Sequence, residues 1–264
     1  MQFLTVVIRR SLYAFLLLLA VIVFNYTLLF LVPGDIAETI AGESGGASAE
    51  LMAEIRRSYG LDQPFYVQLF GYVGRVLQGD LGSSYYFNVP VLDLILGRLG
   101  PTLLLVVPSL LLAIFTGTLF GVIASQRPNG IFSHFITILA LIGFSAPVFW
   151  TAFLLIILFV SMLQILPLSG LAEPLTESGT WQWYLDVAYH LILPVVSLSS
   201  IYLAQYSRLA RASMMDILGS DYIRTARAKG LGQRVIIYKH ALRNAVIPVI
   251  TIAGLQFSHI FSGA

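Results

Sequence analysis

Few residues of this chain could carry out chemistry, and their spacing forms no catalytic or metal-binding motif. The sequence has no cysteine, which excludes a disulfide and a thiolate metal site. It contains no G-x-x-x-x-G-K-S/T phosphate loop, no H-E-x-x-H zinc motif and no G-x-S-x-G nucleophile turn. We therefore expect the chain to hold no catalytic, cofactor-binding or metal-ligating residue of its own, and no ATPase site.

Three histidines, His134, His190 and His259, lie in or near apolar runs. They could form a proton relay, or each could be an interfacial side chain with local hydrogen bonds, and the second interpretation is the more ordinary one. The uncharged runs contain no Asp, Glu, Lys or Arg, whereas ion-coupled carriers usually keep an ionisable group in the membrane. If the protein moves a solute uphill, we expect a partner protein to supply the energy.

The most distinctive stretch is the basic segment 208–243, which holds eight Lys and Arg residues but only two acids, Asp216 and Asp221. Its helix-forming residues are interrupted at Gly219, Gly230 and Gly232. Because glycine permits the positive φ of a sharp turn, two helices joined at residues 230–232 are predicted. Composition alone leaves a second interpretation open, a loop made basic only to fix its side of the membrane.

The composition excludes a soluble enzyme, a disordered chain and a nucleic-acid module. Of 264 residues, 58% are hydrophobic and 11% charged, against about 25% charged in soluble domains. The mean hydropathy is +0.85 and the formal net charge is +2. A helix that crosses a bilayer needs about 20 apolar residues, and several runs of this chain are long enough.

We expect one transmembrane domain over residues 1–264. Its predicted spans cover about 11–32, 99–126, 131–164, 187–207 and 244–264. The first run is interpreted as a retained span because its apolar core exceeds that of a signal peptide and the cleavage-like Ala47-Ser48-Ala49 lies far from it. The third is expected to be one long crossing bent at Pro147, and Pro194 lies inside the fourth.

The distribution of charges predicts on which side of the membrane each segment between the spans lies. Segments 1–10, 126–130 and 208–243 hold eleven of the 15 Lys and Arg residues, whereas segments 33–98 and 164–186 hold eleven of the 13 acids. Because basic residues near span ends stay in the cytoplasm, the N-terminus is predicted to be cytoplasmic. Segment 33–98 is then outside, where apolar spacing predicts short helices over 51–59 and from Pro64 to Leu77, either on the membrane surface or as a packed lid.

Two glycines in the second run, Gly117 and Gly121, are four residues apart. This spacing lets another helix approach closely, and that helix could belong to this chain or to a second membrane subunit.

Residues 221–244 resemble the cytoplasmic loop of ABC-importer permeases of the dipeptide, oligopeptide and nickel family, in particular its first permease subunit. The resemblance extends along nearly the whole chain. The other segments that carry it are Leu31–Asp35, Gly60–Pro64, Gly79–Ser83, Arg98–Leu105, Ser145–Trp150 and Gly254–Phe257.

In that family the loop is a coupling helix that docks on the cytosolic ATPase, which the resemblance implies here too. The implied coupling residues are Arg224, Thr225, Ala226, Arg227, Ala228, Lys229, Gly230, Leu231, His240, Leu242 and Arg243. The wider importer superfamily marks this loop with a Glu-Ala-Ala triplet, a Gly four residues after the second Ala, and an Ile-x-Leu-Pro ending. Ala226, Gly230 and Leu242 fit that pattern. The Glu, first Ala, Ile and Pro of that pattern are replaced here, as they are in the peptide branch.

The resemblance implies an all-α polytopic helix bundle with the type I, methionine-importer-like fold, in a bacterial or archaeal inner membrane. It implies a second permease, two ATPases that bind ATP, and an extracytoplasmic solute-binding protein as partners. Peptides are the expected cargo, with nickel or another solute as the alternative. An ion-coupled carrier and a non-transporting scaffold remain as rivals. Family members have a sixth span, so this chain, with five, is either incomplete or a shortened permease whose C-terminus lies outside, and we expect it to be incomplete.

Overall fold

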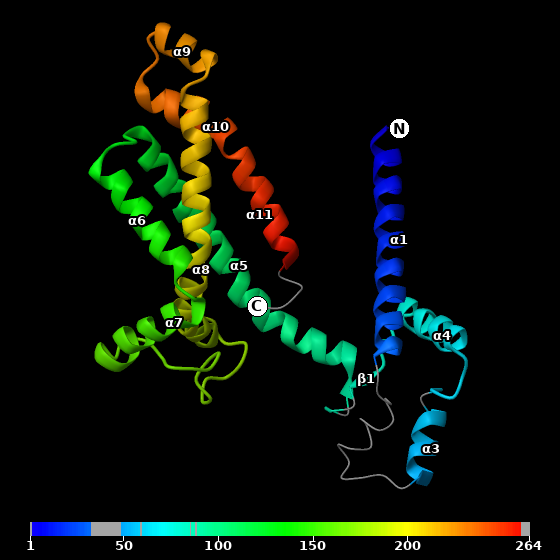
Figure 1. Ribbon diagram of the computed structural model, residues 1–264. Coiled ribbons are helices and arrows are strands. Elements are labelled where there is room, and N and C mark those ends of the chain that lie inside the picture. Colours follow the sequence, from blue (N-terminus) through cyan, green and yellow to red (C-terminus); the bar gives the residue numbers. More distant parts are fainter. Residues whose placement is uncertain (1, 33–48, 59, 85, 88, 260–264) are drawn as a thin grey trace. The chain divides into compact units, whose positions relative to one another are not determined.

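The computed structural model describes residues 2–32, 49–58, 60–84, 86–87 and 89–259 (Figure 1). The described residues are mostly helical, which confirms the predicted all-α class. The chain divides into two compact units, residues 1–97 and 98–264. The single domain expected over residues 1–264 stays a prediction.

The first unit contains the long apolar helix α1 (Gln2–Leu31) and two shorter helices, α3 (Ala49–Ser58) and α4 (Phe65–Leu77). Aromatic rings join α1 to α4: Tyr26 stacks on Tyr72 at 5.0 Å, and Phe30 meets Phe65 at 4.8 Å. The hydroxyl of Tyr26 also donates a hydrogen bond of 2.9 Å to Gln68 Oε1. The two short helices predicted in the outer segment are thus present, and α4 packs against α1.

A glycine with positive φ follows each of the two short helices. Gly60 after α3 has φ +65° and Gly79 after α4 has φ +82°, values that a residue with a side chain rarely adopts. A two-stranded hairpin that was not predicted follows, with β1 (Ser83–Ser84) antiparallel to β2 (Val89–Pro90). The sequence signal is weak because each strand has only two residues.

The second unit is built around two long helices, α5 (Val91–Gln126), which belongs to this unit from Arg98 onward, and α8 (Trp181–Leu218). Helix α6 (Ile131–Ser145), helix α7 (Val148–Ile156) and the π-helical turn η1 (Ile157–Met162) lie between them in the sequence. After α8 come α9 (Asp221–Ala228), η2 (Val235–Ala241), α10 (Leu242–Ala245) and α11 (Ile247–His259).

Three helices within the described residues are long and apolar enough to cross a membrane: Phe3–Leu31, Val91–Gln126 and Trp181–Leu218. Two bent helix pairs also pass this test, so the described residues contain up to five spans if each pair counts as one. The first pair, Ile131–Gly143 and Val148–Met162, is bent by 104°, and the second, Val235–Ala245 and Ile247–Ser258, by 41°. The five predicted spans therefore correspond to three single helices and two bent pairs. The last five residues of the fifth predicted span lie outside the described residues.

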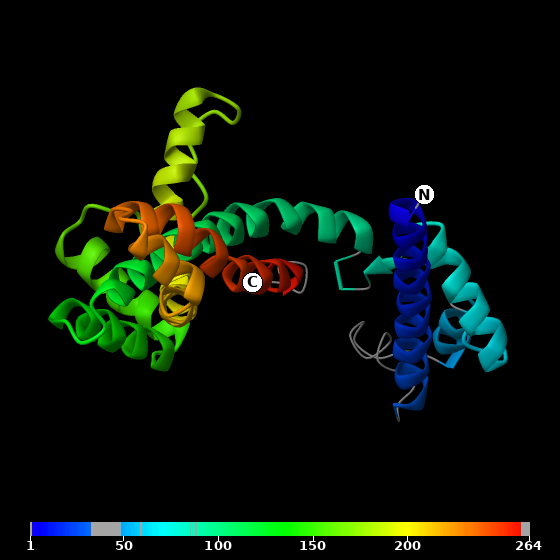
Figure 2. The ribbon, with the colours of Figure 1, turned by 90° about the horizontal axis from the view of Figure 1, so that it is seen from above.

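The break between α6 and α7 is much sharper than a proline kink in a continuous helix. Pro147 precedes the first residue of α7, and Ala146 before it is extended, with φ −80° and ψ 130°. Proline lacks an N–H group and disfavours the helical conformation of the residue before it, so the helix ends here and restarts in another direction. By contrast, Pro194 lies inside α8, and in Figure 2 the first part of α8 turns away from the remainder.

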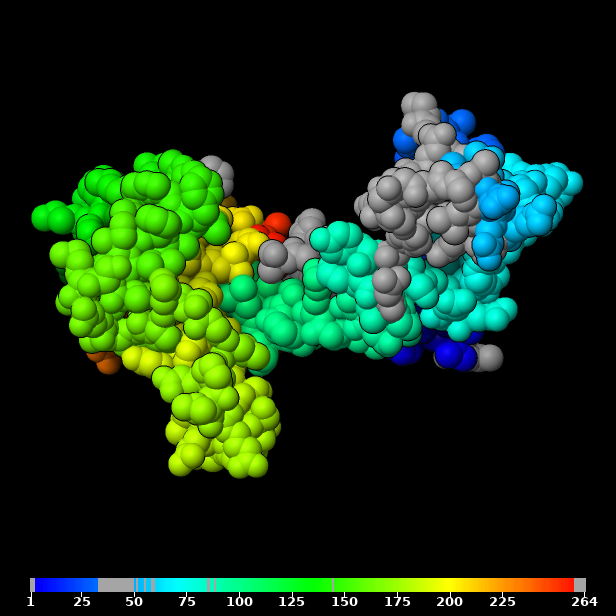
Figure 3. Space-filling model, turned by 90° about the horizontal axis from the view of Figure 1, so that it is seen from below, coloured from blue at the N-terminus to red at the C-terminus, as the bar shows by residue number. Residues whose placement is uncertain are grey.

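Helix α8 organises the packing of the second unit, because α5, α6, α7, α11 and η2 all contact it. Gly117 and Gly121 of α5 lie against the backbone of α8, so the glycine pair serves packing within this chain. Gly143 of α6 lies against α8 in the same way, with the Ser200 carbonyl 3.2 Å from the position of a Cβ. Figure 3 shows the yellow-green loop before α8 and the start of that helix standing away from the rest of the unit.

Candidate functional site

The basic segment singled out in the sequence folds as a helical hairpin at the end of α8. Helix α8 continues beyond the predicted span to Leu218, and Gly219 ends it. Ser220 has the extended conformation of an N-cap residue, and Asp221 stands in the first turn of α9, where a carboxylate interacts favourably with the helix dipole. The two predicted helices are therefore present, as α9 and η2.

Gly230 forms the sharp turn after α9. Its φ is +75°, and two backbone hydrogen bonds close the helix end: Gly230 N–H donates to Arg227 at 2.9 Å, and Leu231 N–H to Ala226 at 3.3 Å. This pair of bonds is the Schellman motif, in which glycine is preferred because it adopts the left-handed conformation without strain. No atom lies within 4 Å of a Cβ at position 230 among the described residues, so backbone conformation alone selects glycine there.

A buried cluster fixes the hairpin to the spans. Ile223 and Ala226 of α9 contribute to it, as do side chains of α5, α8, η2 and α10. The other members are Val122, Met214, Ile236, Ile237, Ala241 and Ala245. The hairpin is therefore packed directly against α5 and α8.

Hydrogen bonds add a polar tie on the exposed side of this cluster. Asn244 of α10 donates from Nδ2 to the hydroxyl of Tyr222 in α9 at 2.9 Å. That hydroxyl in turn lies 3.5 Å from the carbonyl oxygen of His240. The two arms of the hairpin are thus joined at a second place, 22 residues apart in sequence.

The outward surface of the hairpin is basic with an apolar strip. Arg224, Arg227 and Lys229 are exposed on α9 and the turn after it. Leu231, Val235 and Tyr238 are exposed as well. Arg224 lies 3.3 Å from Asp221 Oδ1, and such an exposed pair leaves the charge accessible to a partner. A surface of cations around apolar side chains suits a partner with carboxylates around an apolar groove.

The predicted coupling residues do not all reach this surface. Eight of them are exposed: Arg224, Thr225, Arg227, Ala228, Lys229, Gly230, Leu231 and Arg243. His240 and Leu242 are partly buried, and Ala226 is only 8% exposed within the cluster below the hairpin. The small side chain of Ala226 therefore serves packing inside the chain, whereas Ala228 presents a small side chain outward.

Polar contacts connect α8 to the helices beside it. Arg211 donates from Nη1 to Thr137 Oγ1 of α6 at 2.8 Å, and from Nη2 to the Pro128 carbonyl at 3.1 Å. Farther along, the hydroxyl of Tyr206 donates to Gln256 Oε1 of α11. Gln256 Nε2 donates to Gln205 Oε1 at 2.8 Å. These contacts join α8 to α6, to the Pro128 carbonyl and to α11.

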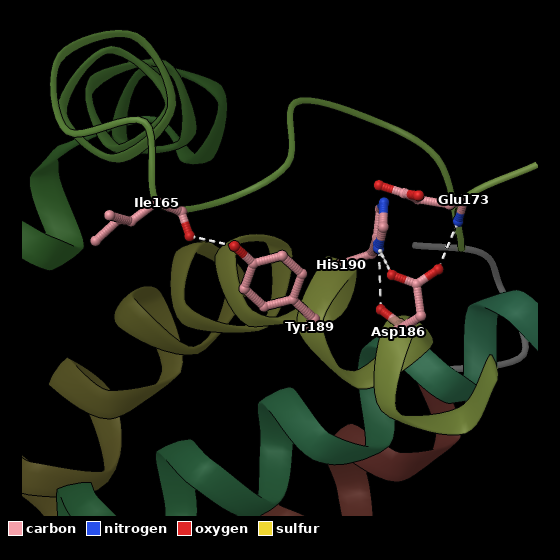
Figure 4. Close-up of polar contacts among 5 residues, drawn as sticks. All are labelled: Ile165, Glu173, Asp186, Tyr189 and His190. Carbon is pink, nitrogen blue, oxygen red and sulfur yellow. Dashed lines mark hydrogen bonds and ion pairs between the residues drawn. The ribbon is translucent and has the colours of Figure 1, made fainter. Parts of the chain in front are cut away.

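One polar cluster was not anticipated as a unit. Asp186 and His190, four residues apart on α8, pair at 3.1 Å, and the carboxylate also accepts the N–H of Glu173 at 2.6 Å (Figure 4). The spacing of Asp186 and His190 was a usable signal, but the loop contact was not visible in the sequence. The bonding confirms that His190 is a hydrogen-bonded histidine. Among the described residues, no group of three or more His, Asp or Glu side chains could hold a metal ion.

Comparison with known families and proteins gives consistent results. Residues 117–264 match the family of binding-protein-dependent transport system inner membrane components, and residues 2–106 match the N-terminal region of the corresponding membrane components. The chain is 37% identical to a probable peptide ABC transporter permease of Sinorhizobium fredii, over 97% of this chain and 80% of that protein.

Two further relatives carry more specific names. The dipeptide transport system permease protein DppB of Escherichia coli is 37% identical, over 91% of this chain and 76% of that protein. The oligopeptide transport system permease protein AppB of Bacillus subtilis is 36% identical, over 98% of this chain and 80% of that protein.

Proposed function

This chain belongs to the family of binding-protein-dependent transport system inner membrane components, and on that basis we propose that it is a permease subunit of an ATP-driven peptide importer. It is a multi-pass helical protein of the cytoplasmic membrane, and its relatives are named as peptide and dipeptide permeases. The nickel alternative is not favoured, because none of these three relatives carries a nickel name.

In this proposal the hairpin couples the chain to ATP hydrolysis in another subunit. The observation that carries it is the buried cluster that joins α9 and η2 to Val122 of α5 and Met214 of α8. A partner that grips the exposed basic surface would move the hairpin, and the cluster would pass that movement to two spans. The chain itself contributes no ATP site and performs no catalysis.

The proposed assembly contains a second, homologous permease, two cytosolic ATPases and an extracytoplasmic binding protein. In this proposal the N-terminus lies in the cytoplasm, which the distribution of Lys and Arg supports. Arg227, Lys229 and Leu231 are the central contacts with the ATPase, because they are exposed next to the Gly230 turn.

The test uses the complete transporter in proteoliposomes, with uptake of leucyl-alanine and ATP hydrolysis measured together. Wild-type uptake should require ATP and should persist when an uncoupler removes the ion gradient at constant ATP. Gly230→Val should nearly abolish uptake, since a β-branched residue at φ +75° is strained by more than the ~1–2 kcal/mol typical of the left-handed region. Gly230→Asn should restore most of it, because asparagine tolerates that region.

Gly232→Val is the matched control. Position 232 also has open space around a Cβ, but its φ is not positive, so its uptake should stay near wild type. Normal uptake with Gly230→Val would contradict the coupling role of the hairpin. Uptake that collapses with the uncoupler would instead indicate an ion-coupled carrier, and absence of any uptake would favour a scaffold.

A further inference from the structure

The second unit contains a pocket of about 390 Å³ beside the bend in α8. This volume is within the range of small-molecule sites, roughly 300–1,000 Å³. Its walls come from α5, α7, α8 and the loop before α8, and they are mainly apolar. The lining residues include Val148, Ala152, Gly170, His190, Leu193 and Ser197.

The loop that forms one wall is fastened to α8 at two points. The hydroxyl of Tyr189 donates to the carbonyl of Ile165, and the N–H of Glu173 donates to Asp186 Oδ2 at 2.6 Å (Figure 4). Gly170, between these points, has φ +97°, a conformation that favours glycine. The wall is therefore held in place by specific contacts on both sides of the pocket-lining residues.

His190 presents a hydrogen-bond acceptor at this wall. Its Nδ1 lies 3.1 Å from Asp186 Oδ1 and 2.9 Å from the Asp186 carbonyl oxygen, both of which can only accept. The tautomer with its proton on Nδ1 satisfies both contacts and leaves Nε2 as an acceptor. His190 and Gly170 both line the pocket, and Cδ2 of the imidazole ring lies 4.0 Å from the ideal Cβ position of Gly170. The side chain is 6% exposed.

Ser197 presents a second polar atom two helical turns farther along α8. Its side chain is 4% exposed, and its Oγ has no hydrogen-bond partner in the described residues. Nearby hydroxyls behave differently, because Ser199 and Ser200 donate to backbone carbonyls of the preceding turn at 2.9 and 2.7 Å. Thr118 Oγ1 and Ser133 Oγ also lack partners within the described part of the chain, but neither lines this pocket. Because buried polar side-chain atoms are usually hydrogen-bonded, the unpaired Ser197 Oγ at the pocket wall is available to a ligand.

We propose that this pocket binds the N-terminal residue of the transported peptide. The α-ammonium group donates hydrogen bonds to His190 Nε2 and Ser197 Oγ, and the negative charge of Asp186 behind the imidazole favours a cation. The first side chain of the peptide packs among Val148, Ala152 and Leu193. A lipid tail fits the same apolar walls but leaves both acceptors unpaired. The inference rests on the proposed function, because it takes a peptide as the cargo.

The test is photolabelling of the complete transporter in proteoliposomes with photo-leucyl-alanine, a dipeptide whose first side chain carries a diazirine. Label should appear in peptides that cover residues 148–156 or 190–198. Excess leucyl-alanine should remove it, whereas N-acetyl-leucyl-alanine, which lacks the ammonium group, should not. The proposal would be overturned if both competitors removed the label equally. It would also be overturned if neither removed it, and that result would indicate an apolar site of the kind that binds lipid.

Ser197→Ala and Ser133→Ala form a matched pair, because both remove a buried hydroxyl that has no partner among the described residues. Neither should lower the melting temperature, since neither breaks a bond within the fold. Only Ser197→Ala should reduce labelling, by about tenfold for a lost hydrogen bond to a charged group. Equal labelling of the two variants would contradict the assignment. His190→Phe should reduce labelling further. In this variant the difference between the two competitors, leucyl-alanine and N-acetyl-leucyl-alanine, should disappear.

Uptake of leucyl-alanine is measured in the same vesicles. ATP-driven uptake without labelling in the pocket would refute the subsite and leave the proposed function intact. No ATP-driven uptake by the wild-type transporter would refute the proposed function itself.

Discussion

Gly121 of α5 lies directly against Ser207 of α8: a Cβ on Gly121 would be 2.6 Å from the Ser207 carbonyl oxygen. It would also be 2.7 Å from the Cβ of Ala210. Gly117, one turn earlier, is nearly as confined, with the carbonyl of Leu203 at 2.9 Å. Because backbone atoms cannot move aside as a side-chain end can, these two glycines set the spacing of the two helices.

We predict that Gly121→Ala destabilises the protein by about 1–3 kcal/mol, the usual cost of forcing extra volume into a packed interface. The apparent melting temperature in detergent should fall by several degrees. Gly254→Ala in α11 is the control, since no atom of the described residues lies within 4 Å of its Cβ position, and its melting temperature should stay the same or rise slightly. Equal melting temperatures for both variants would show that α5 and α8 are not in close contact.

The limits of sequence-based prediction are physical, as the spans illustrate. The uncharged run 187–207 marked only the membrane-depth part of α8, because charged residues such as Arg208 and Asp216 do not end a helix. Gly219 ends it instead. Pro147 revealed a break in the third span, but the angle of 104° depends on how α7 packs against α8. Proline fixes where a helix ends and leaves the new direction to tertiary contacts.

Tyr206→Phe should remove the hydrogen bond to Gln256 and keep the aromatic ring in the core. Hydrogen bonds between membrane helices contribute about 0.6 kcal/mol on average and up to about 1.7. We therefore expect a small but reproducible fall in the melting temperature, with the α8–α11 contact weakened. Tyr66→Phe is the control, because the Tyr66 side chain is 61% exposed. A larger fall with Tyr66→Phe than with Tyr206→Phe would contradict this prediction.

Arg211 and Thr137 should be energetically coupled, since their side chains meet at 2.8 Å. The single variants Arg211→Met and Thr137→Val should each destabilise the protein. The double variant should lose less free energy of unfolding than the two single variants lose together. The difference should be about 1 kcal/mol or more, as expected for a hydrogen bond from a charged donor. Costs that add to within about 0.5 kcal/mol would show that the two side chains act independently.

The candidate site shows the same division between what local sequence determines and what packing determines. Gly230 was predicted as the turn because only backbone conformation decides that position. The pairing of Asp186 with the N–H of Glu173 depends on how a loop folds back on α8, which no local pattern encodes. Likewise, Ala226 and Ala228 look alike in sequence, and only the packing of α9 separates a buried alanine from an exposed one.

The contrast between these two alanines separates packing from docking. Ala226→Val should overpack the cluster that contains Ile223 and Ile236, and we expect a cost of about 1–3 kcal/mol. The permease purified without partners should then melt at a lower temperature. Ala228→Val should leave that melting temperature unchanged because its side chain is exposed.

In the complete transporter the second variant should show its effect. A larger side chain at position 228 would stand between α9 and the ATPase, so Ala228→Val should weaken retention of the ATPase and reduce peptide uptake. Retention is measured by co-purification through a tag on the permease. If Ala228→Val melts, retains the ATPase and transports as wild type does, the partner does not contact this face of α9, and the exposed basic surface must serve another role.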